Sequence, residues 1–332
     1  MNARKLNRTL FIRDNLDILR TIKDKSVDLI YLDPPFNSNK NYGQPIGSKL
    51  AGFHFKDMWY LSDTDEAWWG ELSESSPSLY NLLHSVGTIN GKKDKSYLIY
   101  MTMRLIEMHR ILKDTGSIYL HCDQTMSHSL KLVMDAIFGK KNFKREIIWN
   151  IAVLSGFKTI AKNWIRGHDV ILYYSKSKNA YFEKQYTPHT EKYLSMFNKE
   201  DSEGKYLIAH NKKRYKKDVI RKGRNIGDVW SDIKSFQQIC TSKEKVGYKT
   251  QKPLALVDRI IKASSKEGDL VLDPFCGCAT TCISAEKLKR KWIGIDISDK
   301  ASDLIKMRFK DELGLKPSLV TIRRDLPIKN AP

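Results

Sequence analysis

The clearest signal for the fold of this chain is the segment Asp269-Leu-Val-Leu-Asp273-Pro274-Phe-Cys-Gly-Cys-Ala-Thr-Thr281. An apolar run between two aspartates predicts a short buried strand, and the loop around Gly277 then leads into a helix. A second strand, Trp292-Ile-Gly-Ile-Asp296, follows about 20 residues later and also ends in an aspartate. This order of strand, tight loop, helix and strand is typical of a ligand site at the carboxyl edge of a parallel sheet.

Strands and helices alternate outward from this stretch. Short apolar runs predict strands, and apolar residues at three- and four-residue spacing predict helices. The expected strands are 26–33, 117–121, 146–149, 169–174, 269–273 and 292–296, and the expected helices are 97–112, 129–138 and 253–263. The alternation indicates an α/β fold with helices on both faces of a sheet. The polar, basic region 176–250 interrupts it and is interpreted as an insertion.

The aspartates at the two strand ends indicate the kind of ligand. Asp296 is placed to accept both ribose hydroxyls of a nucleoside, and Gly277 allows close approach of the backbone. The three-glycine pattern of dinucleotide sites is absent, and Asp273 would repel a phosphate. An ammonium group suits Asp273 better, so we expect a nucleoside cofactor that carries an amino acid and no phosphate.

The tetrapeptide Asp33-Pro34-Pro35-Phe36, at the end of strand 26–33, is a second candidate site. The lone pair of a nucleobase amino group is delocalised into the ring, so the nitrogen must become tetrahedral before it attacks an electrophilic methyl group. The Asp33 carboxylate and the Pro34 carbonyl are acceptors for its two hydrogens, and Phe36 offers a stacking face. A base in a duplex must be flipped out to reach them. Taken alone, the tetrapeptide is equally compatible with a turn that ends a strand.

Composition favours a nucleic-acid partner. The 332 residues include 58 Lys and Arg against 38 Asp and Glu, a formal net charge of +20. Such an excess favours binding to a polyanion. An acidic membrane is the disfavoured alternative, because no amphipathic basic helix and no membrane-spanning run is present. The amino terminus lacks the features of a secretion signal, so we expect a cytoplasmic protein.

Cysteines, histidines and tryptophans are assigned structural roles. The five cysteines, at 122, 240, 276, 278 and 282, form a poor disulfide framework, and we expect them to be reduced. No second pair or histidine completes a metal site around them, so no metal is expected. His121 and Asp123 are interpreted as hydrogen-bonding residues. The tryptophans at 59, 68, 69 and 230 are interpreted as core residues.

Together, these segments resemble the amino-methylating DNA methyltransferases, specifically the permuted (beta) group in which the catalytic tetrapeptide precedes the cofactor loop. The resemblance covers most of the chain. It rests on five segments in one order: Tyr31-Leu-Asp-Pro-Pro-Phe-Asn37, Ile118-Tyr-Leu-His-Cys-Asp123, His168-Asp-Val-Ile-Leu-Tyr-Tyr-Ser-Lys176, Thr250-Gln-Lys-Pro253 and Asp273-Pro-Phe-Cys-Gly-Cys-Ala-Thr-Thr281.

The resemblance implies a fold, a reaction and a set of site residues. The fold is a Rossmann-like, mainly parallel seven-stranded sheet with one antiparallel strand, circularly permuted, in which strand 8–12 neighbours strand 292–296. The reaction is methyl transfer from S-adenosylmethionine to N6 of an adenine. The implied catalytic residues are Asp33, Pro34, Pro35 and Phe36; the implied cofactor-binding residues are Asp14, Lys252, Pro253, Asp273, Pro274, Phe275, Gly277, Thr280 and Asp296. Ala279 stands where the family commonly has a second glycine, and we expect a small adjustment there.

The resemblance also divides the chain into a catalytic half (1–175), a basic target-recognition insertion (176–250) and a cofactor-binding half (251–332). Double-stranded DNA is the implied partner, so the protein is expected to associate with the nucleoid through DNA. The residues expected to contact it are Lys212, Lys213, Arg214, Lys216, Lys217, Arg221, Lys222 and Arg224. Dimers are frequent in the group, so a homodimer is expected. The sequence leaves open whether a cognate restriction endonuclease accompanies the protein.

Three rival functions remain open from the sequence. A cytosine-N4 methyltransferase would use almost the same pocket, although such enzymes more often have serine where Asp33 stands. An RNA methyltransferase is disfavoured by the basic insertion and the permuted order. A DNA-binding subunit without catalysis is disfavoured by the intact Asp33, Phe36 and Asp273.

Overall fold

The computed structural model describes residues 6–36, 41–43, 54–56, 63–153, 155, 160, 162–239, 241–248 and 250–326. For 41–43, 54–56 and 63–65 it describes the backbone only. Asn37, Trp59 and Cys240, which the sequence singles out, lie outside the described residues.

A nine-stranded sheet forms the centre of this structure, in the order β13-β6-β7-β5-β2-β14-β15-β1-β16. Neighbouring strands run parallel, except that β7 is antiparallel to both β5 and β6. The strands are β1 (Thr9–Ile12), β2 (Val27–Leu32), β5 (Leu112–Cys122), β6 (Phe143–Asn150), β7 (His168–Ser175), β13 (Val229–Trp230), β14 (Leu270–Asp273), β15 (Lys291–Asp296) and β16 (Thr321–Arg323).

The mainly parallel α/β fold predicted from the sequence is confirmed. The seven longer strands form the expected frame with its single antiparallel member, and the short β13 and β16 extend it at the two edges. β1 pairs with β15, with Ile12 opposite Asp296. β2 precedes β14 in the chain and lies beside it in the sheet, which is the permuted order.

One local prediction differs from the structure. Residues 113–116, which lie between the predicted helix 97–112 and the predicted strand 117–121, are part of β5, because Leu112 already pairs with Val27 and a register shift before Leu29 absorbs the irregularity. Gly116 lies at this shift. A Cβ atom there would lie 2.8 Å from the carbonyl oxygen of Asp28, so the close approach of the two strands requires glycine.

Helices cover both faces of the sheet, as expected. Along β14, Leu270 and Leu272 pack into one core cluster and Val271 packs into the other. Trp68 and Trp69 pack against the first cluster and Trp230 lies in the second, so these tryptophans are core residues. The helices of the first face are α1 (Asn15–Thr21), α2 (Asp63–Ser75), α3 (Pro77–Asn90), α4 (Lys92–Ile111) and α5 (Ser127–Phe138); those of the second are α8 (Leu254–Ser264), α9 (Thr280–Lys287) and α10 (Lys300–Leu313).

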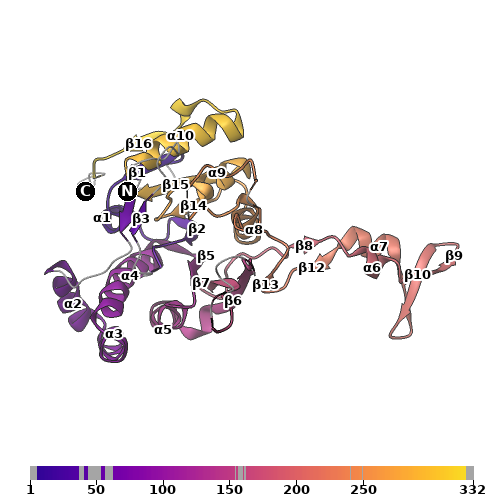
Figure 1. The fold of residues 1–332 in the computed structure, drawn as a ribbon, viewed down its shortest axis with the longest axis horizontal. Helices are drawn as coiled ribbons and strands as arrows, with labels where there is room; N and C mark the ends of the chain where they lie inside the picture. The colour runs from indigo at the N-terminus through magenta and orange to yellow at the C-terminus, as the bar shows by residue number, and fades with distance from the viewer. Residues whose placement is uncertain are drawn as a thin grey trace.

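An arm, defined here as residues 186–225, projects from this body (Figure 1). At its root β8 and β12 pair antiparallel, with Tyr186 opposite Asn225. Further out, β9, β10 and β11 form a three-stranded antiparallel sheet. The arm elements are β8 (Tyr186–Thr187), α6 (Glu191–Leu194), β9 (Lys199–Asp201), β10 (Gly204–Ala209), β11 (Lys212–Tyr215), α7 (Lys216–Lys222) and β12 (Arg224–Asn225).

The predicted insertion 176–250 contains this arm. It also contains a return segment, defined here as the described residues from 226 to 250, that packs on the body. Val229 and Trp230 join the edge of the central sheet as β13. Tyr248 and Thr250, shortly before the amino end of α8, line a cavity. The remaining short elements are β3 (Asn41–Gly43), β4 (His54–Lys56), and the 3-10 turns η2 (Lys140–Asn142) and η4 (Pro317–Leu319). Among the described residues, no helix combines the length and apolarity needed to span a bilayer.

Candidate active site

Four adjacent strands, β2, β14, β15 and β1, end at one edge of the sheet, and the residues there enclose a cavity of about 430 Å³. Parallel neighbours bring their carboxyl ends together. Asp33 follows β2, Asp273 ends β14, Asp296 ends β15 and Asp14 lies just after β1. Four carboxylates that are far apart in sequence therefore line one pocket.

The structure brings nearly all the predicted site residues together. Lining the cavity are Asp33, Pro34, Pro35 and Phe36 together with Asp14, Lys252, Asp273, Pro274, Phe275, Gly277, Thr280 and Asp296. Pro253 does not line it, and instead caps the amino end of α8 next to Lys252. Lining residues that the site prediction omitted are Arg13, Asn15, Tyr31, Tyr100, Tyr248, Thr250, Gln251, Cys276, Cys278, Thr281, Ile297 and Ser298.

Asp33 pairs with a lysine from the other half of the chain. Lys252 Nζ donates to Asp33 Oδ2 over 2.5 Å and lies 5.2 Å from the ring centroid of Phe36. The two side chains are 10% and 17% exposed, so the pair is largely shielded from water. Asp33 Oδ1 is buried and has no hydrogen-bond partner among the described residues. A buried, unpaired acceptor is costly, so this oxygen marks the position where a donor from a ligand is expected.

Phe36 rests on a buried polar network. Its ring stacks on His121, with centroids 5.9 Å apart and planes 26° apart. His121 Nε2 lies 3.1 Å from Asp169 Oδ2, and His121 Nδ1 lies 3.0 Å from the Tyr31 hydroxyl. Burial opposes ionisation of Asp169, but the hydrogen bond from His121 and the nearby Lys252 and Arg166 bring its pKa below the usual value. The ionised Asp169 accepts from Nε2, so in the neutral imidazole Tyr31 donates to Nδ1, and these two contacts support the ring that stacks on Phe36.

The loop 273–281, predicted to bind the cofactor, contains two residues in the left-handed region. Gly277 has φ +48°, and its N–H donates to Asp296 Oδ2 over 2.8 Å. Ala279 has φ 63° and ψ 29°, directly before α9, with its methyl group fully buried. Alanine is disfavoured in this conformation by roughly 1 kcal/mol. The turn therefore keeps a glycine-like geometry at Ala279, in line with the small adjustment expected there.

Burial raises the pKa of two aspartates beside this loop, Asp273 and Asp296. It raises the pKa of Asp273 to about 7, against the hydrogen bonds from Thr281 Oγ1 and the Phe275 N–H, and the nearby Asp33 and Asp296 add repulsion. Burial also raises the pKa of Asp296, although the N–H groups of Ser298 and Gly277 donate to its carboxylate. A cationic ligand group beside Asp273 would favour its ionised form.

Asp14 is held by an arginine that the sequence reading missed. Arg104, 1% exposed, donates to both oxygens of Asp14 and to Asn15 Oδ1. Asn15 in turn donates to the carbonyl of Pro274 over 2.8 Å. This chain of contacts joins α4, the start of α1 and the cofactor loop. Its sequence signal is a charged residue on the apolar stripe of a helix, since Arg104 follows Met101 by three residues and precedes Met108 by four.

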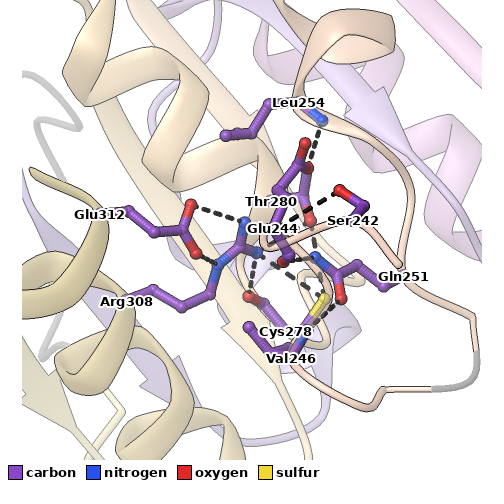
Figure 2. Close-up of polar contacts among 9 residues, drawn as sticks. All are labelled: Ser242, Glu244, Val246, Gln251, Leu254, Cys278, Thr280, Arg308 and Glu312. Atoms are coloured by element: carbon purple, nitrogen blue, oxygen red, sulfur yellow. Dashed lines mark hydrogen bonds and ion pairs between the residues drawn. The ribbon is translucent and has the colours of Figure 1, made fainter. Parts of the chain in front are cut away.

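A second buried arginine holds the loop from outside (Figure 2). Arg308 on α10 donates to the Cys278 carbonyl at 2.7 Å and to Thr280 Oγ1 at 3.0 Å, and its guanidinium pairs with Glu312. Figure 2 also shows the return segment, where Gln251 bridges Val246 N–H and the Glu244 carbonyl. The side chain of Glu244 accepts from Leu254 N–H at the start of α8. Lys252 therefore enters the pocket from a fixed backbone.

The described cysteines, at 122, 276, 278 and 282, are free and buried. Burial raises the pKa of Cys122 and Cys278, and the contact with Cys282 followed by burial raises that of Cys276, so these thiols stay protonated. Among the described residues, no group of three or more His, Cys, Asp or Glu side chains is arranged to hold a metal ion.

The predicted DNA-contacting residues all lie on the arm, but they fall into two classes. Lys213 pairs with Asp201, Lys217 with Glu203 and Arg221 with Asp218. The other five have no ion-pair partner within the described part of the chain. These are Lys212, Arg214, Lys216, Lys222 and Arg224.

Comparison with known proteins agrees with this geometry. A family model described as DNA methylase, of the N6 and N4 type, matches residues 27–307. Type II methyltransferase M.EcaI of Enterobacter cloacae is 29% identical, over 87% of this chain and 66% of its own length. For M.BamHI of Bacillus amyloliquefaciens the values are 26%, 91% and 57%, and for DNA adenine methyltransferase YhdJ of Escherichia coli K12 they are 28%, 90% and 81%. The chain thus spans under two thirds of the length of the first two relatives.

Solved structures share the fold. The Thermus thermophilus protein TTHA0409 in complex with S-adenosyl-L-methionine superimposes with a TM-score of 0.52 at 18% identity, over 96% of this chain and 99% of that one. The PvuII DNA methyltransferase (cytosine-N4-specific) superimposes with a TM-score of 0.51 at 13% identity, over 95% and 92%. Because the family model covers most of the chain, including both strand ends that build the cavity, the chain belongs to the N6/N4 DNA methylase family.

Proposed function

We propose that this protein is a site-specific DNA methyltransferase that transfers the methyl group of S-adenosylmethionine to N6 of a flipped adenine. The observation that carries the proposal is the buried, unpaired Asp33 Oδ1 next to Phe36, in the same cavity as the loop from Asp273 to Thr281. One pocket therefore contains three features: a hydrogen-bond acceptor without a donor, an aromatic ring for stacking, and a loop of the type that binds a nucleoside.

The residues present fit S-adenosylmethionine. Asp296, at the end of β15, is the residue for the ribose hydroxyls, and Asp273 is the residue for the ammonium group. Pro274, Phe275, Gly277 and Thr280 line the same cavity, and Asp14, which also lines it, is the residue proposed for the adenine of the cofactor. When bound, the cofactor supplies an electrophilic methyl group on a sulfonium sulfur.

The catalytic residues act on the amino nitrogen of the base. Asp33 Oδ1 and the carbonyl of Pro34 accept its two hydrogens, which favours the tetrahedral geometry needed for attack. Phe36, held by His121, stacks on the base. Lys252 donates to the other carboxylate oxygen, Asp33 Oδ2, which leaves Oδ1 for the amino group of the base. The methylated nitrogen then loses a proton, and Asp33, which already accepts a hydrogen bond from this nitrogen, is placed to accept it.

Adenine, DNA and the partners are the finer parts of the proposal. Aspartate at position 33 favours adenine over cytosine, as does the name of the relative YhdJ, whereas PvuII is the cytosine-N4 alternative within the same fold. Double-stranded DNA fits the net charge of +20 and the basic arm. We also propose a cytoplasmic, nucleoid-associated location and a homodimer. A cognate restriction endonuclease is suggested by relatives such as the StyLTI Mod subunit.

The test measures both the activity and the base. DNA incubated with the protein and tritium-labelled cofactor is digested to nucleosides, which are separated by mass spectrometry. We expect 6-methyladenine from DNA and no transfer to RNA. Recovery of 4-methylcytosine would replace adenine by cytosine as the target, and absence of transfer would favour a DNA-binding subunit.

Asp33→Ala tests the mechanism in the same assay. Loss of one acceptor that matters mainly in the transition state should lower turnover by about 100-fold or more. Cofactor and DNA binding should persist, because Asp33 is not assigned to either. Phe36→Ala should instead weaken capture of the base by roughly 1–3 kcal/mol. Equal turnover of Asp33→Ala and the parent protein would remove Asp33 from the chemistry.

A further inference from the structure

A second cavity, of about 720 Å³, lies between the central sheet and the root of the arm. Its lining comes from β5, β6 and β7, from residues 178–185 and 225–230, and from α8. Figure 1 shows α8, β13 and the arm root as neighbours in this part of the molecule. Lys252, just before α8, lines the active-site pocket, whereas Ala263, near its end, lines this cavity. The two linings share no residue, so the two cavities are separate.

Aromatic rings form one side of this cavity. Tyr119 and Tyr173 stack with centroids 4.3 Å apart and planes 4° apart, and Phe182 continues the stack on Tyr173 at 6.0 Å and 26°. Phe182 is 53% exposed, so it remains open to a further ring. Trp230 is buried, and its indole N–H donates to the Gly227 carbonyl, which fixes the ring. The cavity therefore offers rigid faces for a planar aromatic group.

Basic side chains surround these rings. The lining includes Lys144, Arg145, Lys178, Lys184 and Arg259, against Asp228 as the acidic member. Arg145 is 3.9 Å from Asp228, and Arg259 pairs with Asp232. No residue that the structure describes forms an ion pair with any of the three lysines. Their charge favours an anionic ligand.

From this combination of stacked rings and unpaired lysines, we propose that the cavity binds a nucleotide, with the base on Phe182 and the phosphate on Lys178 and Lys184. It is a second nucleic-acid-binding site, remote from the reacting base and independent of which base is methylated. The nucleotide is either a free mononucleotide or one unit of a strand that passes the arm root, since both present the same ring and phosphate.

Photochemical crosslinking locates the ligand directly. The full chain is irradiated with a thymidine hexanucleotide that carries one 5-iododeoxyuridine, and crosslinked peptides are identified by mass spectrometry. We expect crosslinks within 178–185 and 225–230. A parallel titration with thymidine monophosphate distinguishes the two sources: competition at similar concentration indicates a mononucleotide ligand, and binding of the hexanucleotide alone indicates a strand.

Two variants and one matched control complete the test. Phe182→Ala should weaken binding of the hexanucleotide about tenfold through lost stacking. Lys178→Ala with Lys184→Ala should lower the salt dependence by about 0.7 log units per log unit of salt, because the two lysines contact one phosphate. Lys306→Ala with Lys310→Ala removes the same charge from α10, at the other edge of the sheet, and should leave both quantities unchanged. The proposal is wrong if crosslinks occur only around Asp33 to Phe36, or if Phe182→Ala dissociates a dimer while nucleotide binding is unchanged. A failure to detect methyl transfer does not alter these outcomes.

Discussion

The carboxyl group of Asp273, at the start of the loop 273–281, changes its charge near neutral pH. Burial raises its pKa to about 7, so the free carboxyl group is largely neutral in mildly acidic solution and ionised above neutral pH. An ammonium group is attracted only by the ionised form. We therefore expect the affinity for S-adenosylmethionine to fall by up to about tenfold for each pH unit below 7 and to level off above it. Calorimetric titrations between pH 5.5 and 8.5 measure this dependence.

Asp273→Asn is the control for that dependence, and its effect on the stability of the folded protein also has a predictable direction. Between the unfolded pKa of 3.8 and the folded pKa of about 7, the folded protein holds a proton that the unfolded chain has lost. This contribution of Asp273 to stability is complete below the lower pKa and is lost as pH rises through the higher one. The variant should thus bind cofactor weakly at every pH, and should unfold at a higher temperature than the parent protein at pH 8. A parent-like pH dependence of binding in Asp273→Asn would exclude Asp273 as its source.

Gly277 is the residue at which the loop has least freedom to change. Its φ is +48°, and a Cβ atom there would lie 3.1 Å from the hydroxyl oxygen of Tyr248. Gly277→Ala should therefore destabilise the protein by about 1–2 kcal/mol and weaken cofactor binding. Gly70→Ala is the matched control, because Gly70 lies in α2 with nothing within 4 Å of the position that a methyl group would take, and this variant should gain roughly 0.5–1 kcal/mol. Thermal unfolding and calorimetry of the pair measure both effects, and equal behaviour would show that the loop tolerates a side chain.

Within the arm, basic residues that are adjacent in the sequence lie on different faces of the structure. Along β11, successive side chains point to opposite faces, so Lys212 and Arg214 lie on one face and Lys213 on the other, where it pairs with Asp201. An arginine or lysine that already has a carboxylate partner releases fewer counterions on binding phosphate. The unpaired residues are therefore the better candidates for DNA contact.

Two double variants test this division. Lys212→Ala with Arg214→Ala should reduce the salt dependence of DNA binding by about 1.8 log units per log unit of salt, or 0.9 for each phosphate. Lys213→Ala with Lys217→Ala removes the same charge, but frees Asp201 and Glu203, and should change the slope less. Fluorescence anisotropy on one duplex at several salt concentrations provides the slopes. An identical slope for both double variants would show that paired and unpaired basic residues contribute equally to DNA binding.

Elements with a strong local pattern were predictable from the sequence, and contacts between distant segments were not. β14 and β15 are short apolar runs that end in aspartate, and helix 129–138 ends at Gly139, which has the positive φ of a helix terminus. The short strands β13 and β16 carry no periodicity, because two or three residues cannot display one. They form through pairing with strands already in place.

The candidate site divides in the same way. The tetrapeptide and the loop are recognisable because their residues are contiguous. The pairing of Lys252 with Asp33 joins positions 219 residues apart, and Arg104 reaches Asp14 across 90 residues. Such pairs depend on sheet order, which a local pattern does not specify. A charge on an apolar helix stripe was the available signal for Arg104 and also for Arg308.

In the molecule as a whole, the arm is an addition to the body that holds the sheet and the active-site pocket. None of the described residues between 188 and 223 belongs to the core clusters of the body. The arm has a small interior of its own, in which Phe197 is 2% exposed and lies edge-on to Tyr193. The residues after it return to the sheet and the active-site pocket, so the structural boundary of the arm lies at the root formed by β8 and β12.

Removing the arm at that root tests whether fold and DNA binding are separable. Thr187 and Arg224 are directly paired, so residues 188–223 can be replaced by Asn-Gly, the two-residue connection that suits a hairpin. The shortened chain should keep its cofactor affinity within about twofold, because every pocket-lining residue lies outside the arm. It should bind DNA at least about tenfold more weakly at 0.1 M salt, because the unpaired basic residues between 212 and 222 are gone. Calorimetry with the cofactor and anisotropy with a duplex measure the two quantities on one preparation. Loss of cofactor binding would show that the arm supports the catalytic body, and unchanged DNA affinity would move the DNA-binding surface to the body itself.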